Sequence, residues 1–168
     1  MVPIILTLRV LHIVFGAFWV GAAVFFTFIV EPRVRALGPA VQGPVMRALV
    51  PVMVPALTAS GLIAIGAGIG LALVLQWDNL GFFFSSAWGW SIIVGLVASV
   101  AAAVVGMVLN RRMALQMEAV TKGIQGRAPT PEEGQQLGQL GQRLRALARI
   151  TSVLLLIAVI AMAVARFV

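Results

Sequence analysis

The chain has a single histidine, His12, within the apolar stretch "LHIVFGAFWVG" of residues 11–21. Spacings of three, four and three residues place four residues on one face of a helix: Arg9, His12, Gly16 and Trp19. A neutral imidazole is a ligand for haem iron and for other transition metals. Gly16 leaves room for a flat ring beside His12, and Trp19 offers an aromatic wall one turn further on. Arg9 is placed to meet a carboxylate such as a haem propionate. The face therefore predicts a b-type haem or metal site with His12 as the ligand.

The sequence does not identify the second axial ligand of such a haem, because the chain has no other histidine. Met162, six residues from the C-terminus, is expected at a similar depth and is either that ligand or core filler. A symmetric dimer that contributes His12 twice is another solution. A third interpretation needs no cofactor. His12 then donates a hydrogen bond to a carbonyl or hydroxyl of a neighbouring helix, or faces a wet crevice, because an unsatisfied polar group is costly in hydrocarbon.

Composition excludes most other chemistry. The 168 residues include no cysteine and no tyrosine, so thiolate metal sites, iron–sulfur clusters and cysteine nucleophiles are ruled out. No nucleophile–base pair can be assembled, and whether the protein is an enzyme stays open, since a redox activity would require a bound cofactor. The net charge of +7 comes from basic residues beside apolar stretches, which favours anionic lipid over nucleic acid as the partner.

Hydrophobic residues make up 61% of the chain and the mean hydropathy is +1.08, values typical of an integral membrane protein. Four stretches are long enough to cross a bilayer, which takes about 20 apolar residues. They are residues 3–30, 48–75, 87–109 and 150–168. The sequence predicts an all-α polytopic membrane protein, with residues 1–168 forming a single domain built on a bundle of four transmembrane helices.

The connections between these spans differ in charge. Arg33, Arg35 and Arg47 follow the first span, and seven lysines and arginines lie in residues 110–149. The connection between the second and third spans contains Asp78 and no basic residue. By the positive-inside rule the two basic connections are cytoplasmic, and both termini face outward.

Residues 110–149 are expected to form a cytoplasmic helical hairpin. Thr130, Pro131 and Glu133 have the spacing of a capping box, with Thr130 as the N-cap. Leucines then recur at three- and four-residue spacings at Leu137, Leu140, Leu144 and Leu147. Their expected partners on the extension of the third span are Met113, Met117 and Val120. The hairpin, closed by a turn over residues 122–129, is either a self-packing stalk or a docking surface for another subunit.

Small residues indicate where the spans contact one another, because helices in lipid associate by close backbone approach. The second span offers Gly66 and Gly70, with Gly61 and Gly68 nearby. The third offers Gly95, Ser99 and Ala103 on one stripe. Pro51 and Pro55 are expected to kink the second span or to mark its frayed start.

The stretch "LHIVFGAFWVGAAVFFTFIVEPRV" resembles the first helix of the copper-resistance D family and of HemJ-type protoporphyrinogen oxidases. The shared features are a Leu-His pair, a Trp after six residues, a Gly-containing apolar run and a Pro near the inner end. Small bacterial membrane proteins share the opening together with a Leu-Gly-Pro, here residues 37–39. The resemblance covers about residues 8–47. It implies that His12 is the haem or metal ligand, that Trp19 is its structural neighbour, and that the protein lies in a bacterial inner (plasma) membrane.

The later spans lack the polar residues and lysine expected of a HemJ-type enzyme, and the chain is poor in the histidines expected for copper transport. Three functions therefore remain. The first is a CopD-like haem- or metal-binding protein in electron transfer or in tetrapyrrole or metal handling. The second is a non-catalytic scaffold subunit of a larger membrane complex. The third is a small carrier for a neutral or apolar solute.

Overall fold

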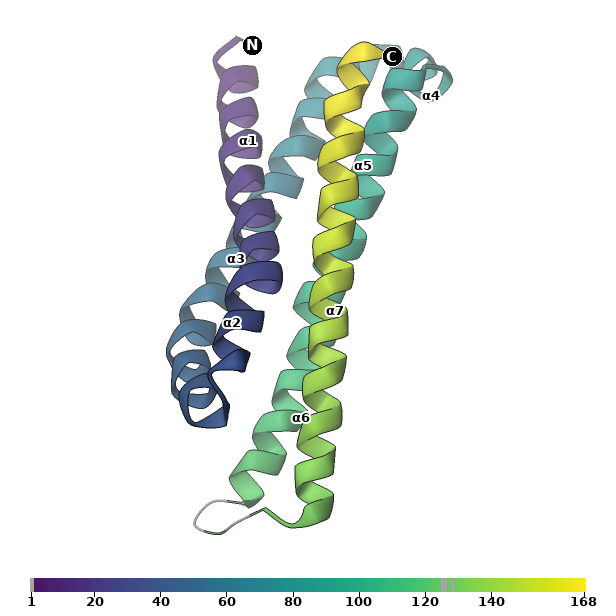
Figure 1. Ribbon diagram of the computed structural model, residues 1–168. Coiled ribbons are helices and arrows are strands. Elements are labelled where there is room, and N and C mark those ends of the chain that lie inside the picture. The colour runs from purple at the N-terminus through teal and green to yellow at the C-terminus, as the bar shows by residue number, and fades with distance from the viewer. Residues whose placement is uncertain (1, 125–126, 128) are drawn as a thin grey trace.

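The computed structural model describes residues 2–124, 127 and 129–168, and every regular element within these residues is a helix (Figure 1). The α-helices are α1 (Val2–Phe25), α2 (Glu31–Ala36), α3 (Pro39–Gln76), α4 (Leu80–Ser85), α5 (Ala87–Ala103), α6 (Asn110–Gly123) and α7 (Pro131–Val164). Two π-helical turns, η1 (Phe26–Val30) and η3 (Val104–Leu109), continue α1 into α2 and α5 into α6. Short 3₁₀ turns follow α3 and α7, at η2 (Trp77–Asn79) and η4 (Ala165–Phe167).

Four of the resulting helical segments are long and apolar enough to cross a membrane. They are Val2–Ala36, Pro39–Ser85, Ala87–Gly123 and Pro131–Phe167. The all-α prediction and the prediction of four spans are therefore confirmed, and the chain is a multi-pass membrane protein. The second span begins at Pro39, and α3 passes through Pro51 and Pro55 as helix, so these prolines do not mark its start.

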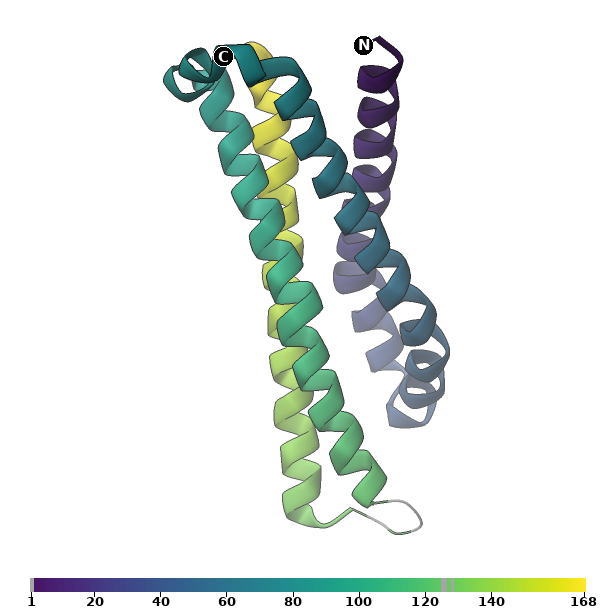
Figure 2. The same cartoon turned by 180° about the vertical axis from the view of Figure 1, so that it is seen from behind.

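The four long helices form two antiparallel pairs. Helix α1 packs along α3, and α5 packs along α7, with thinner contact between the pairs. Figures 1 and 2 show both termini and α4 at one end of the molecule, and the turns after α2 and α6 at the other. The hairpin of α6 and the first half of α7 extends beyond the α2–α3 turn.

The contact between the pairs has a small buried centre, with further apolar side chains partly buried around it. Trp19 of α1 and Leu155 of α7 are buried with Ala102 of α5 in one cluster. Beside it the fully buried Ser152 hydroxyl lies 3.1 Å from the Thr27 hydroxyl oxygen and 3.4 Å from the Ala23 carbonyl oxygen. Ser152 thus joins α7 to the first membrane span. Most large apolar side chains point outward instead, where lipid would surround them.

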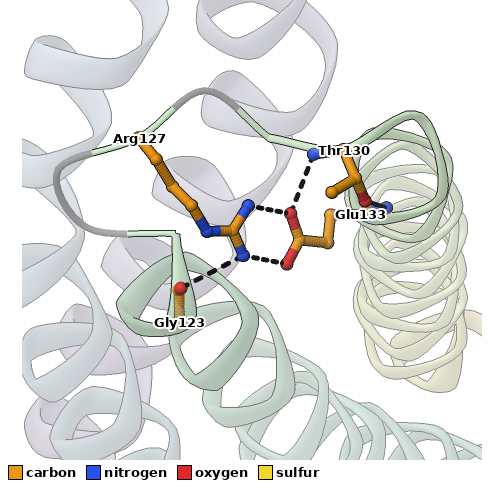
Figure 3. A network of polar contacts seen from close by, with 4 residues as sticks. All are labelled: Gly123, Arg127, Thr130 and Glu133. Atoms are coloured by element: carbon orange, nitrogen blue, oxygen red, sulfur yellow. Dashed lines mark hydrogen bonds and ion pairs between the residues drawn. The ribbon is translucent and has the colours of Figure 1, made fainter.

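Helix α6 packs against α7 to form a hairpin (Figure 1), and the side-chain pairs expected from the heptad-like spacing stay a prediction. Leu140, one of the four leucines of this spacing, is buried. The predicted capping box is confirmed, since the Thr130 side chain accepts from the Glu133 amide and the Glu133 carboxylate accepts from the Thr130 amide (Figure 3). Arg127 adds two hydrogen bonds to the same carboxylate. Of the predicted turn over residues 122–129, residues 125, 126 and 128 lie outside the described part.

Candidate metal centre at His12

His12 lies on the face of α1 that packs against α3. Its Nδ1 atom is 2.7 Å from the carbonyl oxygen of Ala64. A carbonyl oxygen only accepts hydrogen bonds, so Nδ1 must carry the proton and donate. In neutral imidazole this assignment leaves Nε2 with a free lone pair. Histidines that ligate metals are commonly held in this way, with the second ring nitrogen donating to a carbonyl or carboxylate.

A glycine of α3 makes room for the imidazole. A Cβ atom added to Gly68 would lie 2.8 Å from both Cε1 and Nδ1 of His12. That separation is far below van der Waals contact, so only glycine permits the ring to approach the backbone of α3 this closely. In the sequence Gly68 stands out only as a neighbour of Gly66 and Gly70. A Cβ atom on Gly66 meets nothing within 4 Å, so Gly66 is not part of this contact.

Trp19 and Gly16 contribute to the same helix pair. Trp19 is 6% exposed and lies over Gly61, where an added Cβ would be 2.8 Å from the indole Cε2. A Cβ on Gly16 would lie 3.9 Å from the Cβ of Ala64. The space that Gly16 leaves is therefore next to α3, and the aromatic wall of Trp19 is already covered by α3.

The N-terminal end of this face is formed by Leu8, not by Arg9. Leu8 lies against Gly70, 3.4 Å from where a Cβ would be. Arg9 is exposed, and among the described residues its guanidinium forms no ion pair. One α1 residue per turn therefore contacts α3, and Arg9 lies beside that line with its charged group available.

Met162 belongs to the other helix pair. Its Cγ and Cε atoms would lie 2.8 and 2.9 Å from a Cβ on Gly95 of α5. The methionine thus fills the α5–α7 contact, whereas the nearest partners of His12 are Ala64 and Gly68 of α3. The structure does not bring the two predicted ligands together through any of these contacts.

The fit of a haem or metal to this site rests on one atom. Within the part of the chain that the structure describes, no three histidine or acidic side chains group together. The donor set is therefore the single Nε2 of His12, in a side chain that is partly exposed. A metal or haem would have to bind at that nitrogen. It does not fit between Gly16 and Trp19, which α3 covers.

A second polar group lies toward the opposite end of the bundle. Glu31 of α2 and Arg145 and Arg149 of α7 line a cavity of about 30 Å³, which has room for a water molecule. Glu31 also pairs with Arg35, at 3.4 Å between Oε1 and Nε. Among the described residues Glu31 forms no ion pair with either arginine of α7, and the group includes no nucleophile.

The chain was compared with protein-family models, with curated proteins and with solved structures, and none of the three gave a match. The resemblance of the first helix to the copper-resistance D family therefore stays an expectation from its motif.

Proposed function

We propose that this membrane protein binds a b-type haem or a metal ion through Nε2 of His12 and acts in electron transfer or in tetrapyrrole or metal handling. The observation that supports the proposal is the 2.7 Å hydrogen bond from Nδ1 to the Ala64 carbonyl oxygen. It selects the tautomer in which Nε2 is free, and it holds the ring in one orientation.

A haem at this position would supply one-electron redox chemistry at its iron. The residues of the chain would contribute ligation and positioning. His12 would hold the iron from one side, and Ala64 and Gly68 would hold His12. Arg9, exposed one turn outward, would pair with a carboxylate of the ligand. A second copy of the chain would complete the coordination with its own imidazole.

The test is an absorption spectrum of the purified protein, oxidised and after reduction with dithionite, on wild type, His12→Ala and His12→Asn. The Asn amide stands where Nδ1 stands, so it can still donate to the Ala64 carbonyl but has no atom at the position of Nε2. We expect a Soret band in the wild type that both variants lose, with one haem per two chains.

The haem form of the proposal is overturned by a colourless wild-type protein purified from haem-replete cells, or by a Soret band that His12→Asn retains. Metal analysis of the same preparations tests the metal form. It is overturned if the wild type holds no more transition metal than His12→Asn.

A non-catalytic scaffold subunit is the second candidate. The observation that favours it is the packing of His12 and Trp19 against Gly68 and Gly61, which gives both side chains a structural purpose without any ligand. Under this alternative the protein is colourless and metal-free, and it co-purifies with other membrane subunits in a stable complex.

For the orientation, we propose an inner (plasma) membrane of bacterial type, with the termini and α4 outside and the α6–α7 hairpin in the cytoplasm. The proposal is supported by the charge difference between the two ends. The two connections at the end with the hairpin, residues 31–47 and 110–149, contain ten lysines and arginines. The η2–α4 connection at the other end contains Asp78 and no basic residue.

A further inference from the structure

An open groove lies between α6 and α7 at the base of the hairpin, with a volume of about 470 Å³. Leu109, Met113 and Leu147 contribute apolar side chains to it, and Arg112 and Arg143 contribute guanidinium groups. Gln116 adds an amide. The groove thus combines a hydrocarbon surface with two positive charges from two different helices.

In the part of the chain that the structure describes, the two guanidinium groups have no acidic partner. Residues 110–117 and 134–149 contain five arginines and no aspartate or glutamate. Among the described residues the ion pairs are Arg35–Glu31, Lys122–Glu118 and Arg127–Glu133, so neither Arg112 nor Arg143 takes part in one. Both arginines are exposed, and their charges are available to an anion from outside the chain.

The span ends predicted from the sequence place the groove at the depth of the lipid headgroups. Leu109 is the last residue of the third apolar span, and Arg112 follows it by three residues, or about 4.5 Å along a helix. Arg143 precedes Ile150, the start of the fourth apolar span, by seven residues, or about 10 Å. The headgroup layer beyond the hydrocarbon core is about 5–8 Å thick. Long arginine side chains reach back over the remaining distance.

We infer that the α6–α7 groove binds an anionic phospholipid of the adjacent leaflet, with the phosphate between Arg112 and Arg143 and an acyl chain against Leu109, Met113 and Leu147. Guanidinium groups bind phosphate oxygens by charge-assisted, often bidentate hydrogen bonds. The apolar residues continue directly into the membrane span, which selects a lipid over a free phosphate ion. Basic pockets between helices at a membrane surface are suited to this ligand.

The test is native mass spectrometry of the full chain in detergent, titrated with phosphatidylglycerol or with phosphatidylcholine of the same acyl chains. We expect one tightly held phosphatidylglycerol per chain, and affinity about tenfold lower in R112Q/R143Q. The control R47Q/R111Q removes two exposed arginines from the same end of the molecule without touching the groove, and should change the affinity less than about twofold.

A further variant separates the effect of the groove's shape from the effect of its charge. Ala146→Phe fills the groove, which Ala146 also lines, and keeps both arginines, so it should weaken phosphatidylglycerol binding while the helix content stays unchanged. The inference is overturned if phosphatidylcholine binds equally well or if R47Q/R111Q loses as much affinity as R112Q/R143Q. Displacement of the lipid by millimolar inorganic phosphate overturns the lipid as the ligand.

Discussion

A histidine within a membrane span needs a hydrogen-bond partner, and His12 has one in the Ala64 carbonyl oxygen of the neighbouring helix. The bond contributes to helix association, and it also leaves the other ring nitrogen free to accept or to ligate. The structural interpretation of His12 and the ligand interpretation are therefore compatible, because each uses a different nitrogen. Substitutions that affect the two nitrogens separately can distinguish them.

At this residue we predict that His12→Ala lowers the thermal stability of the detergent-solubilised protein more than His12→Asn does. Asn preserves the donor to Ala64, and such interhelical hydrogen bonds are worth about 0.6 kcal/mol on average and up to about 1.7 kcal/mol. Alanine loses the bond and also leaves a void beside Gly68. Equal melting temperatures for the two variants would show that the bond contributes nothing to stability.

At the level of elements, the α1–α3 contact depends on glycines that receive large side chains. Gly61 receives Trp19, Gly68 receives His12 and Gly70 receives Leu8. Without Gly61 and Gly68 the two helices would have to separate, because apolar burial in lipid gives no compensating driving force.

For this pair of helices we predict that Gly61→Ala and Gly68→Ala each destabilise the protein by roughly 1–3 kcal/mol, the usual cost of overpacking a close contact. Gly66→Ala, on the same helix but with open space at its Cβ, should be neutral or should stabilise α3 by up to about 1 kcal/mol. Thermal unfolding in detergent measures all three. A Gly66→Ala variant as unstable as the others would contradict the assignment of the contact face.

An ion pair between Arg127 and Glu133 stabilises the hairpin at the start of α7. The hydrogen bonds from Arg127, and then that from the Thr130 amide, lower the pKa of Glu133 to about 2. Because the pKa is lower in the folded chain, the stabilisation is complete above the ordinary pKa of glutamate, about 4.3, and is lost as the pH falls from there toward 2. The cap is therefore intact at neutral pH.

For this ion pair we predict that Arg127→Gln raises the pKa of Glu133 toward its ordinary value. An NMR titration that follows the chemical shift of the Glu133 carboxyl carbon measures this pKa. Lys122→Gln, which removes a charge from the same hairpin but pairs with Glu118, should leave the pKa of Glu133 unchanged. Equal effects of the two substitutions would mean that net charge, and not the hydrogen bonds, sets the pKa.

At the scale of the whole molecule, the two ends differ in charge and the protein crosses the membrane four times. The natural absence of cysteine makes the topology directly testable. Gly81 of α4 and Gly138 of α7 are both exposed positions where a new side chain meets nothing within 4 Å. Each can carry a cysteine without disturbing the packing.

We predict that a membrane-impermeant maleimide labels Gly81→Cys on intact spheroplasts and labels Gly138→Cys only after the membrane is opened. The prediction follows from the positive-inside rule, by which an arginine-rich connection stays on the cytoplasmic side. The reverse pattern would place the hairpin outside and would reject the proposed orientation.

Several features of this protein followed from local sequence alone. The length and apolar content of the four stretches determined the spans, because a bilayer demands about 20 apolar residues per helix. The capping box at Thr130 and Glu133 was likewise predictable, since it depends on residues only three positions apart.

Only the tertiary structure decided which surface of α1 meets which glycines of α3. Sequence periodicity placed Arg9, His12, Gly16 and Trp19 on one face of α1. The second span contains many glycines, however, so its sequence does not show which of them α1 contacts. The fold selected Gly61 and Gly68 over Gly66, put Leu8 in line with His12, and put Met162 against Gly95. The physical reason is that helix register in lipid is set by the close fit of side chains from distant segments, which local spacing does not encode.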